Sequence, residues 1–169
     1  MDTGELRNLL CYWYSAKKSE ELITMRILYA ASEARPFAAS GGLADVAGSL
    51  PKALCAAGEE ACVVMPYYVN SFKPEQKEKM NYITNFTVPV GWRSQYCGLF
   101  SQQVDGVTYF FIDNEFYFKR DNGLYGYYDD AERYVFFSRA VLEMLKYIQF
   151  KPQVINSNDW QCALIPVYY

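Results

Sequence analysis

No histidine occurs anywhere in this 169-residue sequence. Histidine usually acts as the general base near neutral pH, stands at the centre of Ser-His-Asp triads and is a frequent zinc ligand. Its absence excludes the triad and nearly all zinc sites, so we expect no metal site, and we expect no cofactor either. The sequence also lacks a C-x-x-C pair, because its cysteines are scattered over Cys11, Cys55, Cys62, Cys97 and Cys162. This pattern indicates reduced thiols in a cytoplasmic protein.

Two further absences restrict the partners. No apolar run approaches the ~20 residues needed to span a bilayer, and no basic run occurs among 16 lysines and arginines set against 19 aspartates and glutamates. Membranes and nucleic acids are therefore not expected as partners. Tyrosine and phenylalanine are abundant, with 16 and 11 residues, and tyrosine suits half-exposed surfaces that contact polyols. The composition favours a small or neutral ligand bound to one domain, with or without an appendage.

The first 24 residues form a segment of their own. They have no cationic region and no cleavage site with small residues, so they are not a secretory signal. Their apolar residues fall at helical spacing and would form one stripe: Leu6, Leu9, Leu10, Trp13 and Tyr14. This segment is either a helix that docks on a partner or a membrane surface, or an extension upstream of a domain that begins at Met25. We favour the extension.

Apolar runs of β-type residues alternate with helical patterns along the rest of the chain. We expect strands at residues 25–31, 60–66, 107–112 and 154–155, and helices at residues 42–57, at 129–147 and from 160 onward. Strands that are apolar on both faces belong in a parallel sheet covered by helices. Residues 82–90 and 93–104 alternate instead, which predicts an antiparallel hairpin that turns at Gly91. The predicted fold class is α/β, with a doubly wound, mostly parallel, Rossmann-like sheet and an antiparallel hairpin as an insertion or edge.

The most informative segment is residues 40–46 (SGGLADV), which follows a buried strand and precedes a helical pattern. Without a Cβ atom, the backbone at Gly41 and Gly42 can approach a ligand closely and can adopt a positive φ. The first N–H groups of the following helix favour an anion such as phosphate. The turn matches neither the dinucleotide G-x-G-x-x-G nor a P-loop. Because glycine at such turns also serves purely steric needs, spacing alone leaves both roles open.

Other candidates lie in the loops at the carboxyl ends of the strands, where ligands bind in open sheets. Asp129 and Asp130 could bind sugar hydroxyls or simply cap a helix, with Asp129 and Glu132 forming a start like a capping box. Residues 113–118 mix polar groups with flat rings, which suits carbohydrate but is also typical of a loop packed by its own aromatics.

The segment around Asn158 has two readings as well. It stands where a strand gives way to a helix, so Asp159 could be the N-cap and Trp160 a core residue. Spacing alone nominates no catalytic acid–base pair anywhere in the chain.

Taken together, these motifs resemble bacterial glycogen synthases and plant starch synthases. The matching segments are residues 25–28 (MRIL), 32–33 (SE), 36–46 (PFAASGGLADV), 50–54 (LPKAL), 123–126 (GLYG), 130–133 (DAER), 158–161 (NDWQ) and 163–164 (AL). They occur in family order from Met25 to the last residue. The resemblance implies an N-terminal extension over residues 1–24 and an amino-terminal catalytic domain, incomplete at its C-terminus, over residues 25–169.

The resemblance also implies a function. It is that of the amino-terminal, mainly acceptor-side half of a GT-B glucosyltransferase, which transfers glucose from ADP-glucose to the non-reducing end of an α-1,4-glucan with retention and without metal. The donor-binding residues would be Ser40, Gly41, Gly42 and Leu43. Candidates for the catalytic, glucosyl and acceptor side would be Asn158, Asp129 and Asp130, with Tyr117, Asp159 and Trp160 beside the acceptor.

The chain departs from the family pattern in three ways. Ala39 occupies a position where the family commonly has a lysine that contacts the donor, which puts the donor in question. Asn156 and Asn158 replace histidines that are frequent in bacterial members, although an asparagine before Asp-Trp is similar to starch synthases. The carboxyl-terminal domain is missing, so we expect this chain alone to be inactive. The alternatives are a non-catalytic glucan-binding module and an unrelated nucleotide-sugar-binding Rossmann domain.

Overall fold

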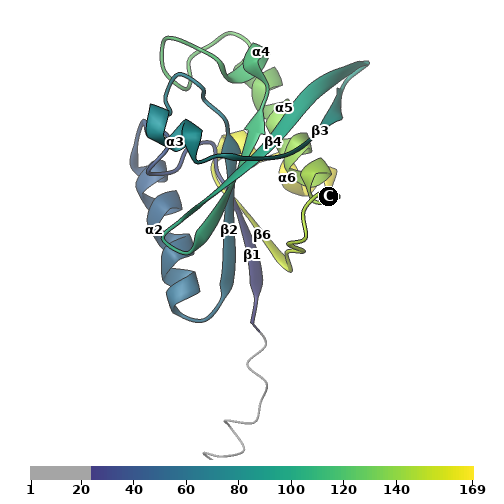
Figure 1. Ribbon diagram of the computed structural model, residues 1–169. Helices are drawn as coiled ribbons and strands as arrows, with labels where there is room; N and C mark the ends of the chain where they lie inside the picture. The colour runs from purple at the N-terminus through teal and green to yellow at the C-terminus, as the bar shows by residue number, and fades with distance from the viewer. Residues whose placement is uncertain (1–23) are drawn as a thin grey trace, which may run out of the picture.

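The computed structural model describes residues 24–169, which form one six-stranded sheet with the order β3-β4-β5-β2-β1-β6 (Figure 1). The apolar stripe predicted within residues 1–24 lies outside the described residues. The parallel strands are β1 (Arg26–Ala30), β2 (Glu60–Pro66), β5 (Val107–Asp113) and β6 (Val154–Ser157). Strands β2 and β5 are buried along most of their length. This confirms the parallel sheet expected from the apolar runs.

The predicted antiparallel hairpin is also confirmed. It consists of β3 (Asn81–Val90) and β4 (Arg93–Val104), and β4 pairs antiparallel with β5, so that β3 is an edge of the sheet. Gly91 has a φ of 60° at the turn, a conformation that glycine adopts without steric cost. The alternate residues Phe86, Val88 and Val90 are buried, as the sequence pattern requires.

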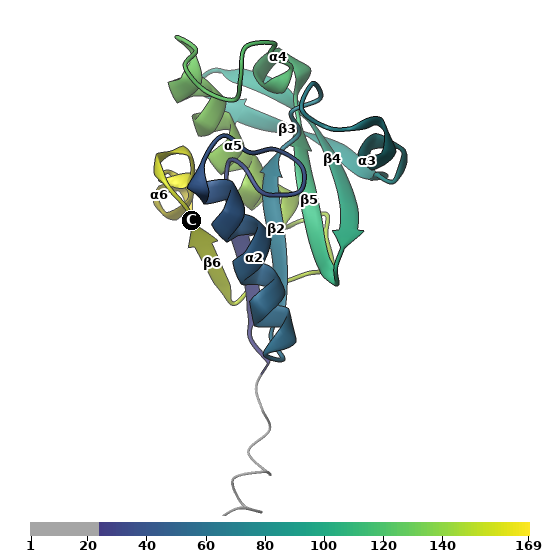
Figure 2. The same ribbon diagram turned by 90° about the vertical axis from the view of Figure 1, so that its left-hand side faces the viewer.

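Two long helices lie on opposite faces of the sheet (Figure 2). Helix α2 (Gly42–Ala56) buries Ala44, Ala47 and Pro51, while α5 (Asp130–Met144) buries eight of its residues on the other face. Gly58 follows the C-cap Ala57 of α2, and its φ of 97° lets the N–H groups of Gly58 and Glu59 bond back to the carbonyls of Cys55 and Leu54. This is the Schellman arrangement.

The remaining elements are short: α3 (Pro74–Glu78), α4 (Glu115–Phe118), the 3₁₀-helix η1 (Trp160–Cys162) and α6 (Ile165–Tyr168). The continuous helix expected from residue 160 is therefore wrong. Pro166 lacks an N–H group and suits the first turn of a helix, so α6 begins at Ile165 as a separate element. Within residues 24–169, no helix is long and apolar enough to cross a membrane.

An aromatic cluster holds the loop after β1 against the sheet. The ring of Phe37 lies 5.0 Å from that of Phe72, 5.1 Å from Tyr109 and 4.7 Å from Phe111. Such offset and edge-to-face contacts add to the free energy gained by burial alone. They fix the loop between β1 and α2, which carries the diglycine segment.

Candidate functional site at the carboxyl edge of the sheet

Three loops meet beyond the carboxyl ends of β1, β5 and β6. Ser32, after β1, shares a 2.7 Å hydrogen bond with the hydroxyl of Tyr125 from the loop between α4 and α5. Asn158, after β6, donates from Nδ2 to the carbonyl oxygen of Ala30 at 3.0 Å. The rings of Tyr125 and Trp160 lie 6.4 Å apart. The structure thus brings together the loops in which the sequence analysis placed its candidates.

A buried glutamate organises the start of the site. The Glu33 side chain accepts hydrogen bonds from the backbone N–H of Ser40 and, at 3.1 Å, from the Ser40 hydroxyl. Glu33 is only 3% exposed, so its carboxylate lies in the protein interior while Ser40 is exposed. Glu33 was not among the predicted site residues, although a charged residue so soon after an apolar strand is a signal that the sequence offers.

The diglycine turn has no structural need for glycine. Gly41 has a φ of −161°, and neither Gly41 nor Gly42 has a positive φ, so the expected positive φ is not found. A Cβ atom built on either residue would meet nothing within 4 Å. Both residues are exposed. The steric explanation weighed for these glycines therefore finds no support, and open space remains in front of the turn.

The first turn of α2 keeps the N–H groups of Gly42 and Leu43 available, whereas that of Ala44 bonds to the carbonyl oxygen of Gly41 at 3.3 Å. Its N-cap, Gly41, has no side chain to cap them, and the first N–H groups of a helix have no partner within the helix. The one acidic residue of the first turn, Asp45, pairs with Arg35 at 2.5 Å. The pair offsets the negative charge of Asp45 close to the helix start, where the backbone favours an anion.

Tyr125 presents a hydroxyl group to this edge. Burial raises the pKa of Tyr125 above its ordinary value of 10.0, and the charge of Glu33 raises it further, against the opposing hydrogen bond from Ser32. The hydroxyl is therefore protonated at neutral pH and can donate as well as accept. Tyr125 belongs to the family-matching segment 123–126 but was not a predicted site residue, because its contacts with Ser32 and Trp160 come from the tertiary fold.

Asp159 is held in an unusual backbone conformation. Its φ of 62° and ψ of 178° lie in a region that is nearly restricted to glycine, and residues held there cluster at functional sites. Its carboxylate accepts from the N–H of Trp160 at 2.7 Å, so the predicted N-cap role is confirmed. Trp160 is 51% exposed and packs edge-to-face on Tyr134 at 5.1 Å, so it is not a core residue.

The two aspartates at the start of α5 are occupied by the protein itself. Asp129 pairs with Arg120 at 2.6 Å, and its side chain makes no capping bond, so the predicted capping box is wrong. Asp130 accepts from the N–H groups of Gly126 and Tyr127 at 2.8 and 3.2 Å and pairs with the fully buried Arg133.

Tyr117 also lies behind the site rather than on its surface. It is fully buried, and its hydroxyl donates to Glu132 at 2.5 Å. Glu132 in turn pairs with Arg93 of the hairpin at 2.6 Å. A direct contact between Tyr117 and an acceptor is not compatible with this burial, so Tyr117 supports the loop that carries the site.

Metal ligation and thiol chemistry find no support in the part of the chain that the structure describes. Among residues 24–169, no group of three potential ligands could hold a metal ion. Cys55, Cys62, Cys97 and Cys162 are free. Burial raises the pKa of the Cys62 thiol to about 12, which keeps it protonated and unreactive.

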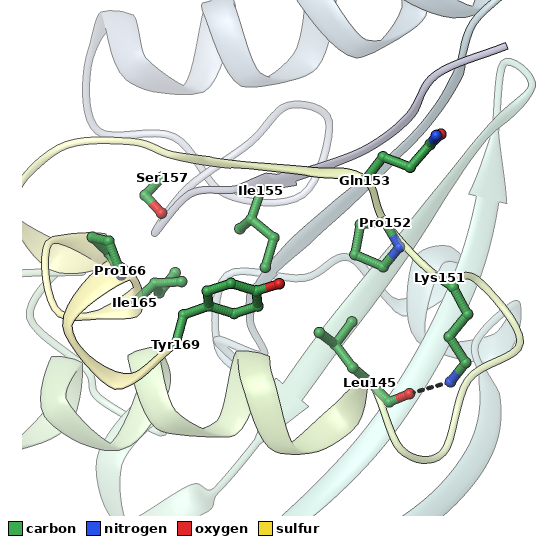
Figure 3. Close-up of a pocket in the computed structure, with 9 residues that line it drawn as sticks. All are labelled: Leu145, Lys151, Pro152, Gln153, Ile155, Ser157, Ile165, Pro166 and Tyr169. Carbon is green, nitrogen blue, oxygen red and sulfur yellow. Dashed lines mark hydrogen bonds between the residues drawn. The ribbon is translucent and has the colours of Figure 1, made fainter. Parts of the chain in front are cut away.

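A pocket lies elsewhere, on the free edge of β6. It has a volume of about 390 Å³ and lies between β6, the loop before it and α6 (Figure 3). Its apolar lining includes Leu145, Ile155 and Ile165. The one charged group, Lys151, already donates to the carbonyl oxygens of Leu145 and Ile148 at 2.5 and 3.0 Å. The pocket therefore offers packing surface and little polar chemistry.

A mostly parallel sheet with loops converging on a polar carboxyl edge defines a Rossmann-like ligand-binding domain. Comparison with known proteins places this domain more narrowly. Residues 26–169 match the family model of the starch synthase catalytic domain. The chain therefore belongs to the starch synthase catalytic domain family.

Similar proteins agree with this assignment. The chain is 54% identical over 143 residues to a glycogen synthase of Clostridium botulinum (strain Eklund 17B / Type B), covering 85% of this chain and 30% of the relative. It is 55% identical over 142 residues to the glycogen synthase of Geobacillus stearothermophilus, covering 84% and 29%. The catalytic domain of starch synthase IV from Arabidopsis thaliana, bound to ADP and acarbose, matches with a TM-score of 0.76 and 29% identity over 86% of this chain and 30% of that one. The chain thus spans about 30% of the length of these relatives.

Proposed function

We propose that this chain is the amino-terminal, acceptor-side part of a glycosyltransferase that transfers glucose from ADP-glucose to the non-reducing end of an α-1,4-glucan with retention. The observation that carries the proposal is the open diglycine turn at the start of α2, which has no internal reason for its glycines. It is supported by the similar starch synthase IV, whose structure holds ADP and acarbose.

In this proposal the N–H groups at Gly41, Gly42 and Leu43 face the donor diphosphate, with Ser40 held behind them by Glu33. During transfer, the bond between the sugar and the diphosphate breaks while positive charge develops on the sugar. Preorganised N–H groups stabilise the departing negative charge without having to reorganise. The positive end of α2 adds to this stabilisation.

The opposite side of the site is assigned to the residues after β6. Asn158, Asp159 and Trp160 line the glucosyl and acceptor side, because Asp159 and Trp160 are exposed and Asn158 is partly so. The strained backbone of Asp159 aims its carboxylate from a fixed position, which serves orientation of the reacting groups. Asp129 and Asp130 hold the neighbouring loop in place through Arg120 and Arg133.

A chimera tests this function directly. Residues 26–169 would replace the matching part of the Geobacillus stearothermophilus glycogen synthase, to which they are 55% identical. We expect the chimera to release ADP from ADP-glucose in the presence of glycogen, and the 169-residue chain alone to release none. The anomeric configuration of the new linkage, read by NMR, tests retention.

Three outcomes would overturn parts of the proposal. A folded chimera without glucosyl transfer overturns the transferase function. Preference for another nucleotide sugar overturns the donor assignment, and turnover by the 169-residue chain alone overturns its inactivity. The proposed role of the Asp159 carboxylate is tested by comparing the chimera with its Asp159→Asn variant. This variant should fold normally and lose most of its kcat.

A further inference from the structure

Two glycines shape the loop that carries Tyr125. Gly123 has a φ of 90° and Gly126 a φ of 95°, conformations that residues with a Cβ atom rarely adopt. The backbone therefore turns on both sides of Leu124 and Tyr125. Leu124 is buried in the core, whereas Tyr125 is only partly buried and reaches the carboxyl edge of the sheet. This loop, residues 123–126, matches the family but has no part in the proposed function.

The backbone on both sides of Tyr125 is fixed to the start of α5. The carbonyl oxygen of Leu124 accepts a hydrogen bond from Arg133 Nη1 at 3.1 Å. The N–H of Gly126 donates to Asp130 Oδ2 at 2.8 Å. Because Arg133 is fully buried and pairs with Asp130, the two contacts belong to one connected group. Tyr125 is thus a side chain in a surface loop whose backbone position is set by α5.

The hydroxyl of Tyr125 reaches the loop after β1. It shares the 2.7 Å hydrogen bond with Ser32, which is fully buried. Besides burial, the charge of Glu33 raises the pKa of Tyr125, so the hydroxyl lies close to the carboxylate that holds Ser40. A hydrogen bond to a buried partner is not readily replaced by one to water. The loop that carries the diglycine turn is therefore tied to Tyr125.

The ring of Tyr125 meets the segment after β6. Its centroid lies 6.4 Å from that of Trp160 and 6.0 Å from that of Tyr134. Tyr134 itself packs edge-to-face on Trp160 at 5.1 Å, so the three rings form one cluster. Trp160 directly follows Asp159, whose backbone is strained. Aromatic contacts of this kind orient the rings relative to one another as well as burying them.

One side chain therefore contacts both walls of the site at the carboxyl edge. We propose that Tyr125 is a positioning residue, which sets the distance between the diglycine turn and Asp159. The inference rests on the proposed function, in which the donor diphosphate lies at the turn and the acceptor lies beside Asp159 and Trp160. Transfer requires that the two reactants be held in line. A turn that moves relative to Asp159 would still bind the donor but would present it poorly to the glucan.

Loss of this alignment has a specific chemical consequence. When the glucan hydroxyl is misplaced, a water molecule can take its position. The bond between the anomeric carbon and the diphosphate oxygen then breaks, a bond from the anomeric carbon to the water oxygen forms, and the products are glucose, ADP and a proton. A residue with a merely structural role would affect stability without changing how the donor is divided between glucan and water.

The kinetic test uses the chimera and compares the ADP released with the glucose incorporated into glycogen. Tyr125→Phe removes the hydroxyl and keeps the ring. It should lower kcat for transfer by about tenfold or more and raise the hydrolysed share of ADP-glucose by a similar factor, while KM for ADP-glucose stays within about threefold. Ser32→Ala removes the same hydrogen bond from its other side and should have the same effects. Circular dichroism checks that both variants are folded, and Ser32→Ala replaces Tyr125→Phe should that one unfold.

Tyr127→Phe is the matched control. The Tyr127 hydroxyl accepts from the N–H of Asn122 at 3.0 Å and donates to the carbonyl oxygen of Gly123 at 3.2 Å, so both bonds stay within the same loop. This variant should leave kcat and the hydrolysed share unchanged. A Tyr125→Phe chimera that matches its parent, or one that loses kcat without a larger hydrolysed share, overturns the positioning role. So does an equal change in the Tyr127→Phe chimera.

A second measurement does not depend on activity. In NMR spectra of the 169-residue chain, Tyr125→Phe should shift the amide signals of Gly41 and Gly42. Because the ring is kept, such a shift reports a movement of the turn, and the indole N–H signal of Trp160 should stay in place. Tyr125→Leu should shift all three signals, and Tyr127→Phe should shift none. Unchanged glycine signals in Tyr125→Phe overturn the proposal whether or not the chimera is active.

Failure of this proposal and failure of the proposed function are distinguishable. An inactive parent chimera, together with shifted glycine signals in the Tyr125→Phe chain, overturns only the transferase function. An active parent chimera whose kcat and hydrolysed share are the same with Tyr125→Phe overturns only the positioning role.

Discussion

Helices α2 and α5 both begin at the carboxyl edge of the sheet, but their first turns are satisfied differently. Helix α2 starts with exposed Gly41 and Gly42, has no side-chain cap and faces open space. Helix α5 starts with Asp129 and Asp130, and each carboxylate pairs with an arginine, while Asp129 Oδ1 is buried without a hydrogen-bond partner among the described residues. Both starts carry the residues of a polar site.

The difference separates a ligand site from a structural anchor. A polar group that is already paired within the protein has little free energy left for a ligand, because binding must first break the existing contact. The start of α5 is in this state, whereas the start of α2 is not.

The largest effect is expected at the anchor. Arg133 is fully buried and donates to the carbonyl oxygens of Tyr117 and Leu124 at 2.7 and 3.1 Å, besides pairing with Asp130. Arg133→Met removes one donor from each of these three groups and leaves Asp130 without its cation, so we expect the free energy of unfolding to fall by about 3–5 kcal/mol. Urea denaturation measures the loss.

Arg139→Met is the control for this change on the same helix. Arg139 lies over the ring of Tyr168 at 5.0 Å and is partly exposed, so its loss should be about 1 kcal/mol or less. Equal losses of unfolding free energy in the two variants would contradict a special structural role for the start of α5.

Most of the fold follows from local patterns, which is why the strands, the hairpin and Gly91 could be predicted. The ion pairs that hold the carboxylates at the start of α5 could not be predicted from local patterns. Asp129 and Glu132 have the spacing of a capping box, but Arg120 and Arg93 draw both carboxylates away from the helix backbone. A sequence window shows the cap residues and not the cations that the fold brings to them.

The next largest effect on the free energy of unfolding is expected at Gly48 of α2, whereas Gly42 of the same helix should behave differently. A Cβ atom at Gly48 would lie 2.9 Å from the backbone oxygen of Arg35, which cannot move aside cheaply. Gly48→Ala should therefore lower the free energy of unfolding by about 1–3 kcal/mol. Gly42→Ala meets open space and should raise it by about 0.4–1 kcal/mol, because alanine has less freedom in the unfolded chain.

The Gly42→Ala substitution should impair donor binding although it does not lower stability. In the chimera, Gly42→Ala places a methyl group where the donor diphosphate is proposed to approach, so KM for ADP-glucose should rise although stability does not fall. Steady-state kinetics at saturating glycogen measure the change. A stable Gly42→Ala chimera with unchanged KM would show that Gly42 is needed neither for stability nor for donor binding. It would contradict the proposal that the donor binds at the start of α2.

A smaller, pH-dependent effect is expected at Glu132. Hydrogen bonds from Arg93 and then Tyr117 lower the pKa of Glu132 from its ordinary value of 4.5. The ionised group therefore stabilises the fold above that value, and the contribution is lost as the pH falls through the folded-state pKa. Because both side chains of the pair are a third or more exposed, the contribution should not exceed about 1 kcal/mol.

Glu132→Gln tests this contribution. The unfolding free energies of the parent chain and the variant should differ near neutral pH and converge well below pH 4.5. A difference that is the same at both pH values would show that packing, not charge, accounts for the role of Glu132.

The smallest effect concerns the exposed Ala39 beside the diglycine turn, at the position where the family resemblance leads us to expect a lysine. An ammonium group near a bound diphosphate is worth about 1 kcal/mol or less at an exposed position. In the chimera, Ala39→Lys should therefore lower KM for ADP-glucose by about fivefold or less while kcat changes little. Ala57→Lys adds the same charge at the far end of α2, where it is exposed, and should leave KM unchanged. If both lysines lower KM equally, the lower KM is an effect of net charge alone. That result would contradict the proposal that the donor anion binds at the start of α2.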